Sequence, residues 1–340
     1  MHVKPALLAI TLASTPHLAH GNDFVGEDFS LRLPAALSGF SVYADVAAKG
    51  GSSAASKFGS SVNPAAMAWY FPGTYDYGIS GQYSNVAFQE GTHLDFITEA
   101  ATVNAHNFGT IRFSFGNVSS NDRTIRDAPL TFTYDLSAGR VDWAKRWGAW
   151  AAGASVSHAA SDTSFRTSQT VFADAERSTT IGRLGVQWEP APHWLAGLVG
   201  EYGYAPTHTE YLFPTAFGLV SSEARDISRQ FIVRPGLAYE WREHALLHFD
   251  YQYARFWNGT GSFDVNRFSV GGDLPLARFL FVRAGAVVDL HGDFGWTAGF
   301  GFYPRKGVTF DFAYQSDVFP ELQREFGHSR TLNASMSVQF

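Results

Sequence analysis

Residues 331–340 read TLNASMSVQF. Every second residue from Leu332 to Phe340 is apolar and the residues between them are polar, so an extended strand here has one apolar and one polar side. A strand that ends on a large aromatic residue is typical of a sheet that closes on itself in a membrane, with its apolar side on lipid and its polar side on a lumen. An edge strand of a soluble β-sandwich has the same alternation. The fold class therefore depends on whether the pattern recurs.

The alternation recurs from Tyr75 onward. It is found in seven further stretches, at residues 75–83, 111–115, 130–136, 150–157, 230–241, 247–253 and 308–315. In the third stretch we expect Phe132 and Tyr134 on the outward side. None of the seven apolar sides carries a charge. A lysine or arginine facing lipid near the bilayer midplane costs about 2–4 kcal/mol, so lipid enforces this rule where water does not.

The connections between these stretches alternate in length. Tight turns lie at residues 189–193, 242–244, 275–277 and 304–306, and longer connections lie near 160–177, 206–227 and 318–330. Counting back from Phe340 predicts strands that begin near residues 76, 109, 147, 193, 245, 279 and 307, and return strands that end near 105, 138, 189, 241, 274, 304 and 340. The sequence therefore predicts an all-β fold, a transmembrane antiparallel β-barrel of about fourteen strands over residues 75–340. A barrel of this size leaves room inside for a plug or a ligand.

The composition agrees with a barrel and excludes several other classes. Of the 340 residues, 16% are aromatic and only 16% are charged. No run approaches the roughly 18 apolar residues of a transmembrane helix. The net charge of −6 offers no basic surface, so we expect no nucleic-acid partner. The absence of cysteine excludes disulfides, thiol catalysis and thiolate metal sites. The histidines are scattered, and we predict neither a metal site nor a cofactor.

The first 21 residues have the pattern of an export signal. Lys4 supplies a positive charge, residues 6–13 are apolar, and Ala19 and Gly21 are small residues at the −3 and −1 places of a cleavage site. We predict a signal peptide at residues 1–21 and a mature chain that begins near Asn22. Together with a barrel, this predicts the Gram-negative outer membrane. The expected partners are outer-membrane lipid around the wall and the barrel-assembly machinery, which would bind the C-terminal strand and its terminal Phe340.

Residues 22–74 lack the strand pattern. They are rich in glycine, serine and alanine, yet they contain apolar anchors such as Phe40, Met67 and Trp69. A disordered leader would carry fewer such residues. We therefore predict an N-terminal hatch, a plug of residues 22–74 packed inside the lumen, with a disordered leader as the alternative.

Within that segment, Asn63-Pro64-Ala65 follows a run of small residues and lies about a dozen residues before the first strand. The tripeptide resembles the hatch signature of the outer-membrane long-chain fatty acid transporter family (FadL-type), which includes aromatic-hydrocarbon channels. The resemblance implies passive uptake of a hydrophobic small molecule, captured by apolar outer loops and released sideways through a gap beside a kinked third strand. In this sequence the lateral-gap candidates are Gly116 and Asn117. The alternative is that Gly116 begins a loop.

The predicted outer loop 206–227 contains an apolar cluster. Outer loops face water, so the cluster suggests a surface that captures ligand; it consists of Tyr211, Leu212, Phe213, Phe217, Leu219 and Val220. Two alternatives are a lid that folds inward and a strand that extends above the membrane. Phe319 and its neighbours Val318 and Pro320 on the last connection are candidates to join this cluster.

The alternation also places charged residues on the lumen side. The principal ones are Arg112, Arg234, Arg267, Arg283 and Asp250, accompanied by Glu201, Glu240, Asp289 and Asp311. One interpretation is a network of arginine–carboxylate pairs that braces the wall and the hatch. The other is that one or two arginines hold a ligand carboxylate with paired hydrogen bonds.

Three other functions fit a barrel of this kind. A general porin needs an unplugged lumen, which the predicted hatch argues against. A structural or secretion-accessory barrel would have the same fold. A lipase-type enzyme needs a serine and a histidine within hydrogen-bond reach, but Ser157 and His158 are adjacent in a predicted strand and so point to opposite sides. We therefore predict that the protein is not an enzyme.

Overall fold

The computed structural model describes most of the predicted barrel and parts of the segment before it. The described residues are 29–38, 40–41, 43–57, 61–70, 76–121, 123–124, 131–166, 171–215, 218–242, 245–290 and 293–340. The predicted signal peptide, residues 1–21, lies outside them.

The described part of the chain contains one antiparallel sheet of fifteen strands. The strands are β1 (Tyr77–Phe88), β2 (His93–Asn104), β3 (Thr110–Ser120), β4 (Arg123–Thr124), β5 (Thr131–Trp147), β6 (Trp150–Arg166), β7 (Val171–Ala191), β8 (Trp194–Thr215), β9 (Gly218–Arg242), β10 (Ala245–Trp257), β11 (Ser262–Ala277), β12 (Leu280–Asp289), β13 (Phe294–Arg305), β14 (Val308–Ser316) and β15 (Ser329–Gln339).

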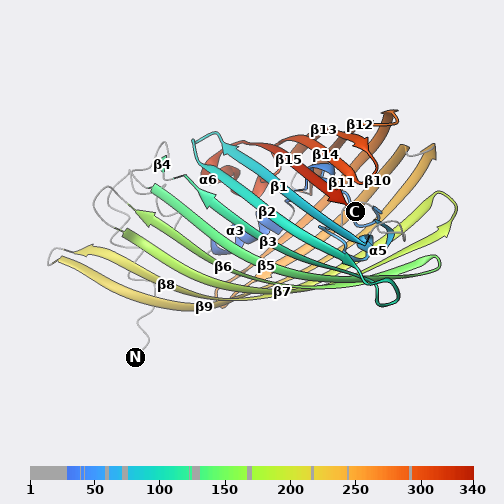
Figure 1. The fold of residues 1–340 in the computed structure, drawn as a ribbon. Helices are drawn as coiled ribbons and strands as arrows, with labels where there is room; N and C mark the ends of the chain where they lie inside the picture. The colour runs from blue at the N-terminus through green and yellow to red at the C-terminus, as the bar shows by residue number, and fades with distance from the viewer. Residues whose placement is uncertain are drawn as a thin grey trace.

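Strands that are neighbours in sequence pair with each other, except β3 and β4, and two further pairings close the sheet. β1 pairs with β15, and β3 pairs with β5 alongside the two-residue β4. The result is a closed barrel of fourteen long strands (Figure 1), as the sequence predicts. The predicted starts of the seven outgoing strands all lie within three residues of the observed ones. One predicted return end is wrong, because β5 ends at Trp147 and not near residue 138.

The outward face of the barrel is an apolar band between two aromatic girdles. One girdle contains exposed tryptophans at the ends of β5 to β9: Trp147, Trp150, Trp188, Trp194 and Trp241. The other, which we call the outer girdle, contains Tyr202 and Tyr204 in the middle of the long β8, with Trp257 at the end of β10 and Trp296 near the start of β13. On β7 the distance between girdles is nine residues, from Thr180, which pairs with Tyr204, to Trp188. A tilted strand needs about 9–11 residues to cross a bilayer, so the band has the height of a hydrocarbon core.

The outward assignment fails at one stretch of β5. Phe132 and Tyr134 are buried inside the barrel and belong to an interior apolar cluster. The residues of this stretch do alternate between apolar and polar, but the interior at this height is itself apolar, so the apolar side of the strand packs inward.

The predicted outer loop 206–227 is wrong as a loop. Residues 207–215 of β8 and 218–226 of β9 continue the cross-strand pairing without a break. Likewise, β6 and β7 extend into the predicted connection 160–177. Continued pairing satisfies backbone groups that a loop would leave to solvent. The strands therefore extend beyond the membrane band, one of the two alternatives for this segment.

The connection between β14 and β15 folds inward. It forms η4 (Pro320–Leu322) and α6 (Gln323–Phe326). Val318, Phe319, Leu322 and Phe326 are buried, and Phe319 is fully inaccessible to solvent. This segment closes over the interior and does not present an apolar surface to water.

The N-terminal segment, defined here as the described residues between 29 and 70, lies within the ring of strands (Figure 1). It forms α3 (Phe29–Ser38), α4 (Ala44–Ala47), η2 (Pro64–Ala66) and α5 (Met67–Tyr70). α4 contacts β13, β14 and β15, whereas η2 contacts β5, β6 and β7 on another part of the ring. No helix among the described residues is long and apolar enough to cross a membrane. The hatch as a whole, residues 22–74, stays a prediction because parts of it lie outside the described residues.

Leu184 tests whether the outward band meets hydrocarbon. It is 69% exposed and lies midway between the girdles on β7. We expect Leu184→Arg to lower the free energy of unfolding in lipid vesicles by about 2–4 kcal/mol, because the charge would enter the hydrocarbon core. Thr180→Arg, at the level of the outer girdle, should cost about 0–1 kcal/mol. Equal effects of the two substitutions would contradict a lipid-facing band.

Candidate functional site

The outer part of the barrel interior is apolar. We call this group the outer cluster: Leu33 and Ala36 of α3; Val86, Phe88, Leu94, Phe96 and Val118 of β1 to β3; Phe132, Tyr134, Phe165 and Ala173 of β5 to β7; and Val318, Phe319, Leu322 and Phe326 of the last connection. It joins the inward face of the wall, the N-terminal segment and the last connection in one continuous apolar volume.

Aromatic rings dominate the outer cluster. The Phe319 ring centroid lies 5.1 Å from that of Phe40 and 5.9 Å from that of Phe88. The Phe326 ring lies 5.2 Å from Phe88 and 5.3 Å from Phe132. These are tilted arrangements at distances where aromatic pairs attract each other. The interior at this height therefore resembles the environment that an apolar or aromatic solute prefers.

A buried ion pair holds the last connection over the cluster. Arg267 of β11 pairs with Glu321 of η4, and both side chains are almost inaccessible to solvent. The partner of this predicted lumen arginine thus comes from the inward-folded connection. Removing one member of a buried pair strands the other charge, so the pair fixes the position of η4.

Next to the N-terminal segment, Arg283 is the centre of a charged network. It donates hydrogen bonds to Asp273 at 2.6 Å, to Asp311 at 2.5 Å and to the Tyr303 hydroxyl at 2.7 Å. Asp273 also faces Lys49 of the N-terminal segment, with 3.4 Å between the charged atoms. The network therefore joins four strands, β11 to β14, to the segment inside them.

The other predicted lumen charges also contact protein groups. Arg112 donates to Asp142 at 3.0 Å, and Arg234 bonds Gln252. Asp250 accepts the backbone N–H groups of Ser53 and Ala54, each at 2.8 Å. The first two contacts brace neighbouring strands of the wall, and the Asp250 contacts join the wall to the N-terminal segment.

The Asn63-Pro64-Ala65 tripeptide has a local structural role. The Asn63 side chain caps η2 by accepting the Ala65 N–H at 3.0 Å, and Pro64 lies at the first helical position, where a missing N–H does no harm. The Asn63 amide donates to the carbonyl of Ala54 at 2.6 Å and to that of Val186 at 3.2 Å. One side chain therefore fixes the turn, its upstream neighbour and the wall.

Glycines in the wall allow the N-terminal segment to approach closely. A Cβ on Gly185 of β7 would lie 2.1 Å from Asn63 Oδ1, and a Cβ on Gly197 of β8 would lie 1.9 Å from the Ala54 carbonyl oxygen. Neither distance is possible between real atoms, so any larger residue at these positions displaces the segment.

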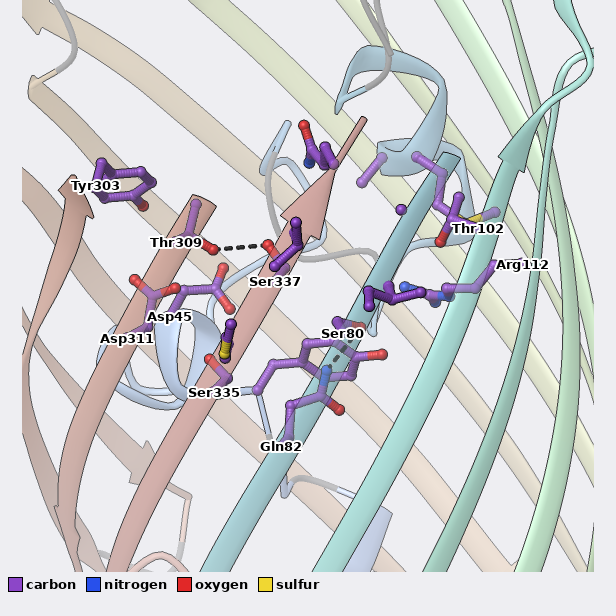
Figure 2. A pocket seen from close by; sticks show the side chains of 18 of the residues that line it. Asp45, Ser80, Gln82, Thr102, Arg112, Tyr303, Thr309, Asp311, Ser335 and Ser337 are labelled. Atoms are coloured by element: carbon purple, nitrogen blue, oxygen red, sulfur yellow. Dashed lines mark hydrogen bonds between the residues drawn. The ribbon is translucent and has the colours of Figure 1, made fainter. Parts of the chain in front are cut away.

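A cavity of about 110 Å³, lined by both polar and apolar groups, lies between the N-terminal segment and β1, β2, β3, β13, β14 and β15. In Figure 2, Asp45 and Asp311 lie on one side and Arg112 on the other, with Ser80, Ser335 and Ser337 between them. Ser337 and Thr309 share a hydrogen bond of 2.7 Å. A space of this size can hold several water molecules, and its hydroxyl and charged groups offer them hydrogen bonds.

The lateral-gap candidates lie in a continuous part of the wall. Gly116 pairs with Thr98 of β2 and with Ala138 of β5, and Asn117 is paired on both sides as well. Gly116 is therefore neither the start of a loop nor the site of a bulge. Pairing is interrupted elsewhere, between β9 and β10 beside Pro235, where the proline has no N–H to donate.

The predicted capture residues fall on the β8–β9 hairpin. Tyr211 packs against the outer cluster, Leu212 is partly buried, and Val220 is 51% exposed. The side chains of Phe213 and Leu219 and the whole of Phe217 lie outside the described residues. The three described side chains therefore do not form one uniform exposed apolar surface.

Pairing also creates clusters that spacing in the sequence did not reveal. His208, Glu210 and Glu223 bring possible metal-ligating atoms within 4.8 Å of one another, because Glu210 pairs with Glu223 across β8 and β9. The two glutamates are exposed, and we assign no metal to them. Ser157 and His158 lie on opposite sides of β6, and His158 bonds Thr180 of β7 at 3.1 Å, so they form no catalytic pair.

No protein-family model matches the sequence, and no curated protein matches it. Several solved structures match the fold. CymD, described as a monoaromatic hydrocarbon channel, has a TM-score of 0.63 at 12% identity, over 87% of this chain and 96% of its own. The Ralstonia pickettii toluene transporter TbuX has a TM-score of 0.58 at 12% identity, over 92% of this chain and 99% of its own. A Pseudomonas aeruginosa FadL homologue has a TM-score of 0.56 at 12% identity, over 87% and 97%.

The fold is that of the FadL-type transporters. These similar structures are transport channels and not enzymes. The matches cover nearly the full length of each channel, so the resemblance in fold extends to the whole barrel.

The close approach at Gly197 tests whether the N-terminal segment is held against the wall. We expect Gly197→Ala to lower the free energy of unfolding by about 1–3 kcal/mol, in the range of overpacked sites. Because the natural chain has no cysteine, an added Ala55→Cys, buried in the parent, reports docking by its reaction with a thiol reagent. Its labelling should rise with Gly197→Ala. Gly200→Ala, on the same strand with open space around its Cβ, should change neither quantity. Unchanged labelling in both would contradict tight docking.

Proposed function

We propose that this chain is a channel of the Gram-negative outer membrane for passive uptake of hydrophobic small molecules, of the fatty acid or aromatic hydrocarbon type. The observation that carries the proposal is the outer cluster, an apolar and aromatic volume inside a closed barrel. A water-filled pore would have a polar interior and not an apolar one. The fold likeness to a hydrocarbon channel and a toluene transporter supports the same substrate class.

The outer cluster can retain an apolar solute by the hydrophobic effect alone. A single aromatic ring that removes about 150 Å² from water gains roughly 4 kcal/mol. Tyr211 packs against the cluster from the extended β8–β9 hairpin, so we propose that solute is captured along this hairpin and passes to the cluster past Tyr211. The last connection, with Phe319 at its centre, would then move aside or let solute pass beneath it.

The residues below the cluster disfavour a straight path to the periplasm. The Arg283 network, and the charged and hydroxyl groups that form part of the cavity lining, would place an apolar solute next to polar groups. A sideways exit into lipid keeps the solute in an apolar environment throughout. We therefore propose lateral release through the wall. Gly116 and Asn117 remain candidates only if β3 separates from a neighbour, because both are paired.

The arginine contacts favour neutral substrates within this class. Arg112, Arg267 and Arg283 each pair with a carboxylate of the protein. A ligand carboxylate would have to displace one of these partners and strand a buried charge. An uncharged aromatic hydrocarbon needs no such exchange. We also propose that residues 22–74 act as a hatch that blocks water flow through the lumen.

Uptake assays test the role of the outer cluster. We expect Phe319→Asn to reduce uptake of labelled toluene at least several-fold, because it places an amide at the centre of the apolar volume. Phe249→Ala, which removes an exposed ring from the outward face, should leave uptake unchanged. Retained resistance to unfolding in cold detergent confirms that each barrel is assembled. Wild-type uptake by an assembled Phe319→Asn barrel would contradict the proposal.

Conductance separates this proposal from a general porin. Because the N-terminal segment and the outer cluster occupy the lumen, we expect no large steady current from the wild-type protein in a planar lipid bilayer. A variant that lacks residues 22–74 should conduct if that segment is the hatch. A large steady wild-type current would favour the porin alternative.

A further inference from the structure

A groove of about 780 Å³ runs across the outer ends of β6 to β9. Each of its two edges contains one residue from each of the four strands. The residues of the lower edge are small or apolar, and those of the upper edge are charged or ionisable. The lower edge is formed by Ala160, Ser178, Pro206 and Ile227. The upper edge is formed by Asp162, Glu176, His208 and Arg225, each paired with the next across neighbouring strands.

The groove lies on the outside of the barrel. Both edges belong to the outward-pointing set of their strands, the set that includes Tyr204. Four residues between the edges, Ser161, Arg177, Thr207 and Asp226, belong to the inward set and also line the groove, whereas the inward residues Ala205 and Ser228 are buried and do not. Because most of the lining belongs to the outward set, the groove opens on the outer face of the barrel, and an occupant would approach it from the surrounding lipid or from solvent.

The outer aromatic girdle fixes the height of the groove. Pro206 follows Tyr204 by two residues in β8, and Tyr204 pairs directly with Arg229 of β9. Arg229 also lines the groove and pairs with Trp257 of β10. Aromatic girdles mark the level of lipid headgroups. The groove therefore begins where the acyl chains end, with its apolar edge towards the membrane and its charged edge away from it.

The polar groups match a particular type of headgroup. Arg225 and Arg229 face the same side of β9 four residues apart, about 13 Å along the strand. Their long side chains can reach towards each other across Ile227, which suits a phosphate group held between them by charge-assisted hydrogen bonds. Asp162 and Glu176, towards the other end, are acceptors for hydroxyl groups. Three strand spacings of about 4.8 Å separate β6 from β9, so the groove is roughly 14 Å long.

We propose that this groove binds the phosphorylated sugar headgroup of an outer-leaflet glycolipid, with its phosphate on Arg225 and Arg229 and its sugar hydroxyls along Asp162 and Glu176. The length exceeds what a glycerol phosphate fills. The outward-pointing part of the lining has two arginines and two carboxylates, which suits an occupant that carries both phosphate and hydroxyl groups. The inference rests on the proposed location in the outer membrane, but not on the transported substrate.

Native mass spectrometry of the detergent-purified protein tests the proposal. The probe is a diphosphorylated glucosamine-disaccharide lipid, compared with its dephosphorylated form and with phosphatidylglycerol. We expect the phosphorylated glycolipid to bind best. The double variant Arg225→Ala with Arg229→Ala should weaken its binding at least tenfold, and the milder Arg229→Gln should weaken it in the same direction. Arg255→Ala is the matched control, because Arg255 is an exposed outward arginine on the adjacent β10 outside the groove.

The outcomes separate this proposal from the transport proposal. Toluene uptake should be unchanged in the double variant, since the groove does not open to the outer cluster. Equal binding of phosphorylated and dephosphorylated lipid, or equal loss in the Arg255→Ala control, would overturn the headgroup site. Preferred binding of phosphatidylglycerol would also overturn it. None of these results bears on uptake, which fails or succeeds by its own assay.

Discussion

The structure depends on the rule that a peptide group in hydrocarbon must find its hydrogen-bond partner within the protein. The ring meets this rule by pairing its last strand with its first. Tyr77 and Phe340 exchange backbone hydrogen bonds of 3.0 Å in both directions, and β3 pairs with β5 across the short β4. Closure creates two separate surroundings, lipid outside and a lumen inside. Each side chain is then selected by which of the two it meets.

Inside the ring, apolar side chains line the outer part of the lumen and charged side chains line the part next to the N-terminal segment. The outer cluster excludes water with aromatic rings, whereas the Arg283 network and the Asp250 contacts hold the N-terminal segment with charges. Buried charges are stable only when paired, so these residues fix the segment in one place. An apolar solute therefore meets a favourable volume first and an unfavourable one next. This order is the physical basis for expecting release into the wall's lipid surroundings.

The alternation of apolar and polar residues was sufficient to predict the closed barrel and the starts of the outgoing strands, because a charged residue on the lipid-facing side is destabilising. The alternation placed Phe132 and Tyr134 on the wrong side of β5. An apolar interior and lipid both favour apolar side chains, so alternation alone cannot tell which of the two a residue faces. It also took residues 206–227 as a loop, although they continue two strands. The partner of Arg267 could not be predicted, because Glu321 reaches it only after the last connection folds inward.

Unequal strand lengths explain where the distinctive surfaces lie. β8 and β9 have 22 and 25 residues, whereas β12 and β14 have 10 and 9, about the number that crosses a bilayer. The surplus forms a tall wall on one side of the barrel (Figure 1), and the inward-folded η4 and α6 cover the lower side. The outer face of this tall wall is exposed to the headgroups and solvent beyond the acyl chains. Its inner face contributes Tyr211 to the outer cluster, and its outer face carries the charged groove beside Arg225. Alternate residues of the same extended strands thus line the interior on one face and the outer surface of the barrel on the other.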